Sequence, residues 1–137
     1  LSLRPDDVAA LTLAPRGGAV VRVERAGAGF RMTSPSAGEA SPTVVLGLLE
    51  RIAGMRVRSR LPADPAALSS RGLDPPLVRV TLLGKDGSSV EVDLGDETPF
   101  DRNRFGRMGT EILVLEDVPA AVLDPDLQGL LGVAGGG

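Results

Sequence analysis

Histidine and cysteine are both absent from the 137 residues of this chain. Without histidine no Ser-His-Asp or Cys-His arrangement can form, and the commonest general base near neutral pH is missing. Without cysteine, disulfides, thiolate nucleophiles and zinc–thiolate sites are excluded. Carboxylate oxygens are the metal ligands that remain, and they suit hard cations such as Ca²⁺. We therefore expect no catalytic residues, no cofactor and no enzymatic activity.

Aromatic residues are scarce as well, and positive charges are outnumbered by negative ones. Three Phe are the only aromatic residues, the net charge is −3, and the pI is about 4.9. Nucleic-acid binding needs a basic surface for phosphates and aromatic side chains that stack on bases, so we expect no nucleic-acid partner. No apolar run reaches the roughly 18 residues of a membrane-spanning helix. Since the chain begins at Leu1 rather than Met, we expect any membrane association to run through a segment outside it.

The composition that remains is typical of one globular domain over residues 1–137, with 42% hydrophobic and 24% charged residues. Apolar and polar residues alternate over 8–13 and 19–25, which predicts a hairpin with one wet face. Ser41 and Pro42 then provide an N-cap and a proline at the first helical position. Apolar residues follow at helical spacing: Val45, Leu48, Leu49 and Ile52.

The second half of the chain repeats the pattern of the first. Thr12-Leu13 matches Thr81-Leu82, and Gly18 matches Gly87 at the same offset, which predicts an internal duplication of a hairpin-strand-helix unit. Because short hairpins are joined to one helix in each half, the expected fold class is α+β: antiparallel sheets with one helix packed per half. The predicted boundaries are 7–61 and 77–131 for the halves and 62–76 for a proline-rich linker.

Three arginines alternate with other residues along one short segment. Arg56, Arg58 and Arg60 are predicted to share one face of a strand, with Arg71 as a fourth member. A row of guanidinium groups can meet an acidic protein partner or anionic lipid headgroups, so these residues are the candidate interaction surface. The alternative is an edge strand that its charges protect from aggregation.

Acidic and amide side chains concentrate in the segment 93–103, at Asp93, Asp96, Glu97, Asp101 and Asn103. Ca²⁺ requires several oxygen ligands, although the spacing does not match an EF-hand loop. A small-ligand or cation-binding role for this acidic loop is thus the alternative function. A solvated loop with Arg102, Arg104 and Arg107 as counter-charges explains the same residues without a ligand.

A compact motif, Gly72-Leu73-Asp74-Pro75-Pro76, closes the linker. The two prolines restrict the backbone, Pro75 restricts Asp74 to extended geometry, and Gly72 can adopt a positive φ. These properties predict an architectural connection, and a loop that docks a partner is the alternative.

This motif and several other segments resemble the bacterial domain family of unknown function DUF4340. A short strand of that family carries an aromatic residue and ends in proline, which here are Phe30 and Pro35. A Leu-Leu pair in a helix, Leu48-Leu49, and a Leu-Gly pair that ends a strand, Leu94-Gly95, are similar to the family as well. Phe30 stands where the family often has Trp, and Phe105 takes the place of a Tyr that often follows the Leu-Gly loop.

The resemblance implies a domain held outside the cytoplasm by an N-terminal membrane helix, in proteins linked to ABC-type transporters of the gliding-motility kind. It carries over no catalytic residue, because the shared motifs are structural. The leading hypothesis is therefore a non-enzymatic extracytoplasmic binding or scaffold domain, periplasmic or at the cell surface and tethered to the inner membrane. Its expected partner is a protein, with transporter subunits as the candidates.

Overall fold

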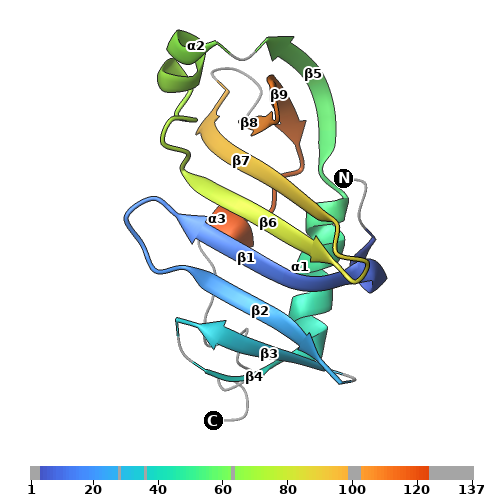
Figure 1. Cartoon of the computed structure of the whole chain (residues 1–137). Coiled ribbons are helices and arrows are strands. Elements are labelled where there is room, and N and C mark those ends of the chain that lie inside the picture. Colours follow the sequence, from blue (N-terminus) through green and yellow to red (C-terminus); the bar gives the residue numbers. More distant parts are fainter. Residues whose placement is uncertain (1–3, 28, 36, 63, 99–102, 124–137) are drawn as a thin grey trace.

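The computed structural model describes residues 4–27, 29–35, 37–62, 64–98 and 103–123 (Figure 1). The strands are β1 (Val8–Pro15), β2 (Val21–Ala26), β3 (Gly29–Ser34), β4 (Gly38–Ala40), β5 (Arg56–Pro62), β6 (Val78–Gly84), β7 (Ser89–Glu97), β8 (Arg104–Met108) and β9 (Glu111–Glu116). The helices are the 3₁₀ turn η1 (Pro5–Asp7), α1 (Pro42–Ala53), α2 (Pro65–Ser70) and α3 (Ala120–Leu123).

All nine of these strands belong to one antiparallel sheet, in the order β4-β3-β2-β1-β6-β7-β8-β9-β5. The expected α+β fold with one helix packed on each half is therefore wrong, because strands dominate the described chain and the fold is closer to all-β. The physical reason is that β1 and β6, which open the two halves, pair with each other and merge both hairpin units into one sheet. α1 is the one long helix of the described chain, and α3 is described over four residues.

The strand order is symmetric about the β1–β6 pair, with β2, β3 and β4 on one side and β7, β8 and β9 on the other (Figure 1). Thr12 and Thr81, which the sequence match equates, are cross-strand partners in this pair. β5 breaks the symmetry, since the chain leaves α1 and crosses to pair with β9 at the far edge. The duplication with halves 7–61 and 77–131 stays a prediction, but its two hairpins lie where a twofold relation would place them.

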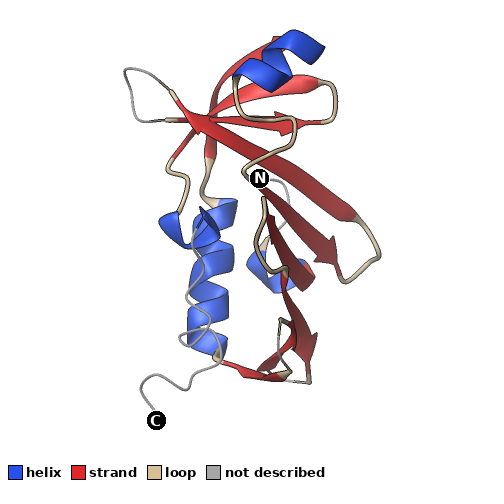
Figure 2. Cartoon of the chain, turned by 90° about the vertical axis from the view of Figure 1, so that its left-hand side faces the viewer, coloured by secondary structure: helices blue, strands red, loops and turns tan. Residues whose placement is uncertain are grey.

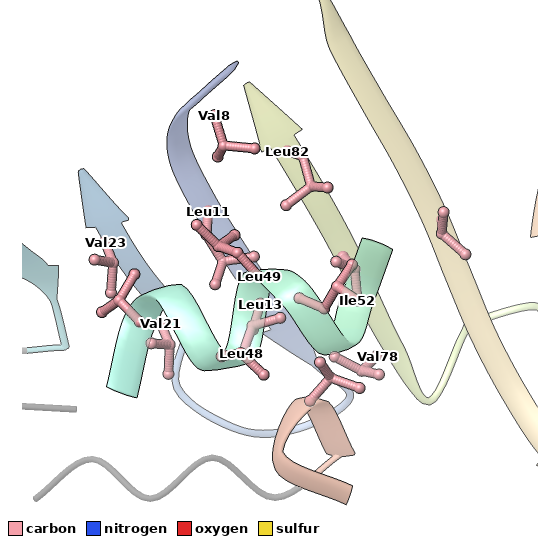
Figure 3. Packing of buried hydrophobic residues seen from close by; sticks show 14 of the residues in the cluster. Val8, Leu11, Leu13, Val21, Val23, Leu48, Leu49, Ile52, Val78 and Leu82 are labelled. Atoms are coloured by element: carbon pink, nitrogen blue, oxygen red, sulfur yellow. The ribbon is translucent and has the colours of Figure 1, made fainter. Parts of the chain in front are cut away.

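α1 forms where the sequence predicts it. The Ser41 hydroxyl oxygen accepts the Val44 N–H at 3.4 Å, Pro42 occupies the first turn, and Gly54 is the C-cap residue. Burial of an aliphatic side chain is worth about 1.5–3 kcal/mol, so the stripe that faces the sheet holds the helix in place (Figure 3). The stripe consists of Val45, Leu48, Leu49 and Ile52, and it packs in one cluster with Leu11, Leu13, Val23 and Leu82 of β1, β2 and β6.

A second, smaller cluster lies on the opposite face of the sheet. Leu113 and Ile112 are neighbours on β9 and therefore point to opposite faces. Leu113 belongs to the cluster under α1, whereas Ile112 packs with Leu68 of α2 and with Leu73. α1 and α2 thus cover different faces, and Figure 2 shows α2 at one end of the sheet, apart from α1.

An arginine from the first half holds the Gly72–Pro76 motif. Arg16, in the β1–β2 turn, donates hydrogen bonds to the carbonyl oxygens of Gly72 at 3.1 Å, Pro75 at 2.5 Å and Pro76 at 3.3 Å. Gly72 has a φ of 72°, the left-handed conformation that its residue type allows. Leu73 is buried in the cluster with α2. The exposed edge of the motif is Asp74 and Pro75.

Phe30 and Pro35, the other motif residues, lie at the start of β3 and directly after its end. Phe30 is buried in the cluster under α1, and the Arg25 guanidinium lies 4.6 Å from the centroid of its ring. Arg25 also donates a hydrogen bond to the Val8 carbonyl at 3.0 Å, which ties β2 to the start of β1. Pro35 directly follows the last residue of β3.

Candidate functional site

The face of the sheet that points away from α1 carries a band of polar side chains. Side chains alternate along a strand. Leu11, Leu13, Val80 and Val92 are buried under α1, so their immediate neighbours in the sequence point to this other side. Figure 1 views β1, β2, β6 and β7 from this side, with α1 and α3 behind them, and no described helix covers these four strands there. The open face, as we call it, consists of Thr12, Arg22, Glu24, Arg79, Thr81, Glu91, Asp93 and Arg107.

Asp93 is the one buried charged residue of the described chain, at 5% exposure. Arg79, its cross-strand partner on β6, binds both carboxylate oxygens, with Nε–Oδ1 at 2.7 Å and Nη2–Oδ2 at 3.2 Å. Two parallel charge-assisted hydrogen bonds are the strong form of this interaction. The hydrogen bond to Asp93 raises the pKa of Arg79 further above its ordinary value, so Arg79 stays protonated.

A pocket of about 430 Å³ opens beside this pair. Arg79, Glu91 and Asp93 line it from β6 and β7, and Arg107, opposite Asp93 on β8, lines it from the other side. Gly109, in the β8–β9 turn with a φ of 61°, completes the lining, and a Cβ there would meet no atom within 4 Å. Gly109 lies two residues after Arg107, just past the end of β8, so no side chain of its own fills this side of the pocket.

The four charges of the pocket are not equally engaged. Arg79 and Asp93 neutralise each other through their two hydrogen bonds. Glu91 lies 3.4 Å from Arg79 Nε as an ion pair and is 54% exposed. Arg107 donates its Nε–H to the Gly109 carbonyl oxygen at 3.1 Å, and no carboxylate of the described residues lies within ion-pair distance of it. Arg107 therefore has no carboxylate partner among the described residues, and Glu91 has only an exposed ion pair with an arginine that is already bound to Asp93.

The structure places Arg56, Arg58 and Arg60 on β5, an edge strand whose seven residues are all exposed. Each of the three is paired with an acidic residue in or next to β9. The pairs are Arg56–Asp117 at 3.2 Å, Arg58–Glu116 at 3.5 Å and Arg60–Glu111 at 3.2 Å. Their charges are thus partly neutralised within the chain, as in the alternative of a charged edge strand.

The four predicted surface arginines do not form one patch. The β5–β9 register shifts between Val57 and Ser59, so Arg56 lies opposite Glu116 and Arg60 lies opposite Leu113. Positions 113 and 116 point to opposite faces of β9, which separates the two arginines, whereas simple alternation predicted one basic face. Arg71 lies elsewhere, at the C-cap of α2, with its guanidinium 4.7 Å from the centroid of the Phe105 ring.

The segment 93–103 is not a single loop. β7 extends to Glu97, and alternating side chains on a strand point to opposite faces. Asp93 is bound to Arg79, Glu97 lies 3.8 Å from Arg104, and the Asn103 N–H donates to the Thr98 hydroxyl. Asp101 lies outside the described residues. Within the described part of the chain, no group of three acidic side chains is arranged to hold a metal ion.

The sequence pattern did not identify Arg79 or Glu91 as site residues. Both stand between apolar residues in strands, a pattern typical of a solvated sheet face. At the offset that relates the two halves, Glu24 corresponds to Asp93, but only the structure shows that Asp93 is buried, so the sequence holds no signal that singles out these residues. A buried carboxylate requires a cation nearby, and Arg79 is the arginine of the paired strand.

Comparison with protein families finds a match to a family model described as a domain of unknown function, DUF4340, over residues 30–124. The match covers all the residues that line the pocket. Comparisons with curated proteins and with solved structures find no match. No helix among the described residues is long and apolar enough to cross a membrane.

Proposed function

This chain belongs to the DUF4340 family, whose description names no activity, and we propose that it is a non-enzymatic binding domain that docks a protein partner on its open face. The observation that carries the proposal is the pocket, where charged side chains of both signs line a cavity on an otherwise uncovered part of the described sheet. Complementary charges give an interface orientation and specificity. The partner that fits offers an acidic group to Arg107 and a cationic group to Glu91.

The pairing inside the pocket favours binding over catalysis. Both oxygens of Asp93 accept hydrogen bonds from Arg79, and the residue is buried, which limits the access of a substrate proton to this carboxylate. The sequence supplies no histidine or cysteine to replace it. We therefore assign the charges of the pocket to recognition.

The setting that we propose is extracytoplasmic, with the domain tethered to the bacterial inner membrane by a segment outside this chain. We also propose that the domain is accessory to an ABC-type transport system. This part of the proposal rests on the resemblance of the Gly72–Pro76 and Leu94-Gly95 motifs, not on the pocket. Transporter subunits are accordingly the first partners to look for.

Site-specific photocrosslinking of the full-length protein in its native membrane tests this proposal. One crosslinker replaces Thr81, which lies opposite Glu91 on the open face. The control crosslinker replaces Val44, which is 41% exposed on α1, behind the sheet. We expect Thr81 to yield an adduct with one membrane protein, a transporter subunit, and Val44 to yield none with that protein.

Charge reversal makes the test specific for the pocket. The Arg107→Glu substitution should abolish the adduct formed from position 81, and the Arg60→Glu substitution on β5 should leave it unchanged. Circular dichroism and thermal unfolding establish that both variants are folded. Equal adducts from positions 81 and 44, or an adduct from position 81 that survives Arg107→Glu, would contradict docking on the open face.

A further inference from the structure

We infer that the pocket recognises a zwitterionic group, with a carboxylate bound by Arg107 and a protonated amine bound by Glu91. Free amino acids, short peptides and neighbouring acidic and basic side chains of a protein all present this chemistry. The inference rests on the proposed function and deepens it, because it names the chemical group that the open face binds.

The buried pair sets the sign of each remaining subsite. Arg79 binds Asp93 through two hydrogen bonds, so neither residue offers a full charge to a ligand. Without Asp93, the two arginines of the pocket would outnumber Glu91, and the pocket would favour an anion. With it, the pocket is neutral overall, and its net preference is for a ligand that carries one charge of each sign.

Arg107 is suited to a carboxylate by geometry as well as by charge. Its Nε–H is directed to the Gly109 carbonyl oxygen at 3.1 Å, which fixes the plane of the guanidinium. The two terminal nitrogens are not used by any carboxylate of the described chain. A fixed guanidinium binds a carboxylate through parallel N–H···O hydrogen bonds, which an ammonium group cannot reproduce.

Glu91 provides the opposite subsite. It lies 3.4 Å from Arg79 Nε, but no hydrogen bond joins the two, and its side chain is 54% exposed. An ionised carboxylate accepts up to four hydrogen bonds, so Glu91 retains the capacity to bind the N–H groups of an amine. It projects from the same face of β7 as Asp93, two positions away.

The size of the pocket fits a small group. Its volume of about 430 Å³ lies in the range of roughly 300–1,000 Å³ typical of small-molecule sites. Its lining is charged and solvated rather than apolar, so little hydrophobic burial accompanies binding. We therefore expect a dissociation constant on the order of millimolar.

Glycylglycine is the probe for this inference, titrated into the full 137-residue chain and followed by ¹⁵N chemical shifts. We expect saturable shifts at Glu91, Asp93, Arg107 and Gly109. Acetate and methylammonium, which carry one charge each, should bind several-fold more weakly. Arg107→Gln should weaken binding of glycylglycine at least tenfold, and Arg107→Lys should weaken it less, because it keeps the charge but loses the planar fork. Arg60→Gln on β5 is the control and should bind normally.

The outcomes separate this inference from the proposed function. Shifts that are absent, or that Arg107→Gln leaves unchanged, overturn the zwitterion site. If the crosslinked partner still depends on Arg107 in that case, docking on the open face stands. If the partner is also indifferent to Arg107→Glu, both proposals fail. Binding of glycylglycine that is lost in Arg107→Gln supports the site, and competition by glycylglycine against the crosslink identifies the partner's own charged groups as the source.

Discussion

Gly95 of β7 lies against the backbone carbonyl oxygen of Arg71, where the Gly72–Pro76 motif begins. A Cβ at position 95 would collide with that oxygen and press on the Leu73 side chain. The next residue along β7, Asp96, donates its N–H to the same oxygen at 2.9 Å. The Leu-Gly pair and the Gly-Leu-Asp-Pro-Pro motif, which are separated in the sequence, are thus one packing unit.

Gly95→Ala should destabilise the fold by about 1–3 kcal/mol, because the added methyl group meets backbone that cannot rotate away. Urea unfolding followed by circular dichroism measures the change. Gly47→Ala in α1 is the matched control, since a Cβ there meets no atom within 4 Å. Alanine is favoured over glycine inside a helix by about 0.8–1 kcal/mol, so this variant should be more stable. A Gly95→Ala protein as stable as the parent would refute the close packing.

Arg79→Met should destabilise the protein by about 1–3 kcal/mol, because it leaves the buried Asp93 carboxylate without its partner. The lower part of that range is the more realistic, since the Arg79 side chain is 45% exposed and solvent screens the pair. Arg60→Met is the control, because Arg60 sits in an exposed ion pair on β5, and such pairs are typically worth about 0–1 kcal/mol. Equal losses in the two variants would argue that the burial of Asp93 has no energetic consequence.

Replacement of both members of the buried pair provides the decisive comparison. The double variant Arg79→Met, Asp93→Leu should recover most of the stability that Arg79→Met loses, since an apolar pair of similar size carries no desolvation cost. A double-mutant cycle by urea unfolding gives the coupling energy. Strict additivity of the two single changes would mean that the residues do not interact in solution.

The local elements were predictable from the sequence, and their long-range pairing was not. α1 begins at the Ser41 cap and buries the predicted stripe, because both features depend on residues a few positions apart. The pairing of β1 with β6 joins residues such as Thr12 and Thr81. No local pattern distinguishes such a pairing from two separate sheets, so the fold class was wrong although the hairpins were right.

The candidate site was less predictable than the fold. A charged residue between apolar ones has the same pattern whether it is solvated or paired, so Arg79 and Glu91 did not stand out. The row of Arg56, Arg58 and Arg60 did stand out, yet each is paired with an acidic residue of the neighbouring segment. One-residue shifts such as that between Val57 and Ser59 move side chains to the other face, and single-sequence alternation carries no sign of them.

A hydrogen-bonded turn makes one surface carboxylate sensitive to pH. Asp86 Oδ1 accepts the Ser88 hydroxyl at 2.6 Å and the Ser88 N–H at 3.0 Å, which lowers the pKa of Asp86 below its ordinary value of 3.8. The pKa of Asp86 is lower in the folded protein than in the unfolded chain. The hydrogen bonds from Ser88 therefore contribute to stability above pH 3.8, and this contribution is lost as the pH falls through the folded-state pKa.

Ser88→Ala should raise the pKa of Asp86 part of the way back to its ordinary value. The hydroxyl hydrogen bond is the larger cause of the shift and disappears, whereas the backbone N–H stays in place. An NMR titration of the side-chain carboxyl carbon measures the pKa directly. Ser69→Ala, at a serine of α2, is the control and should leave Asp86 unchanged. A pKa that does not move in Ser88→Ala would exclude the hydroxyl as the cause.

Arg16→Ala should loosen the Gly72–Pro76 motif without unfolding the sheet. The substitution removes the side-chain hydrogen bonds to three carbonyl oxygens of the motif, while the backbone bond from Arg16 N–H to Leu77 O, at 2.8 Å, remains. A hydrogen bond contributes about 0.5–1.5 kcal/mol net, and exposure places these at the low end. We expect a total loss of roughly 1–2 kcal/mol and faster amide hydrogen exchange at Leu73 and Asp96, whose N–H groups are bonded to Leu68 O and Arg71 O.

The control for this change is Arg31→Ala, which removes another exposed arginine, on β3. It should leave exchange at both amides as in the parent protein, because β3 lies on the other side of the β1–β6 pair from β7. If Arg16→Ala accelerates exchange throughout the sheet, Arg16 supports the whole fold rather than the motif. If exchange at Leu73 and Asp96 is unchanged, the motif is held by the packing of Gly95 and Leu73 alone, since these contacts do not involve the Arg16 side chain.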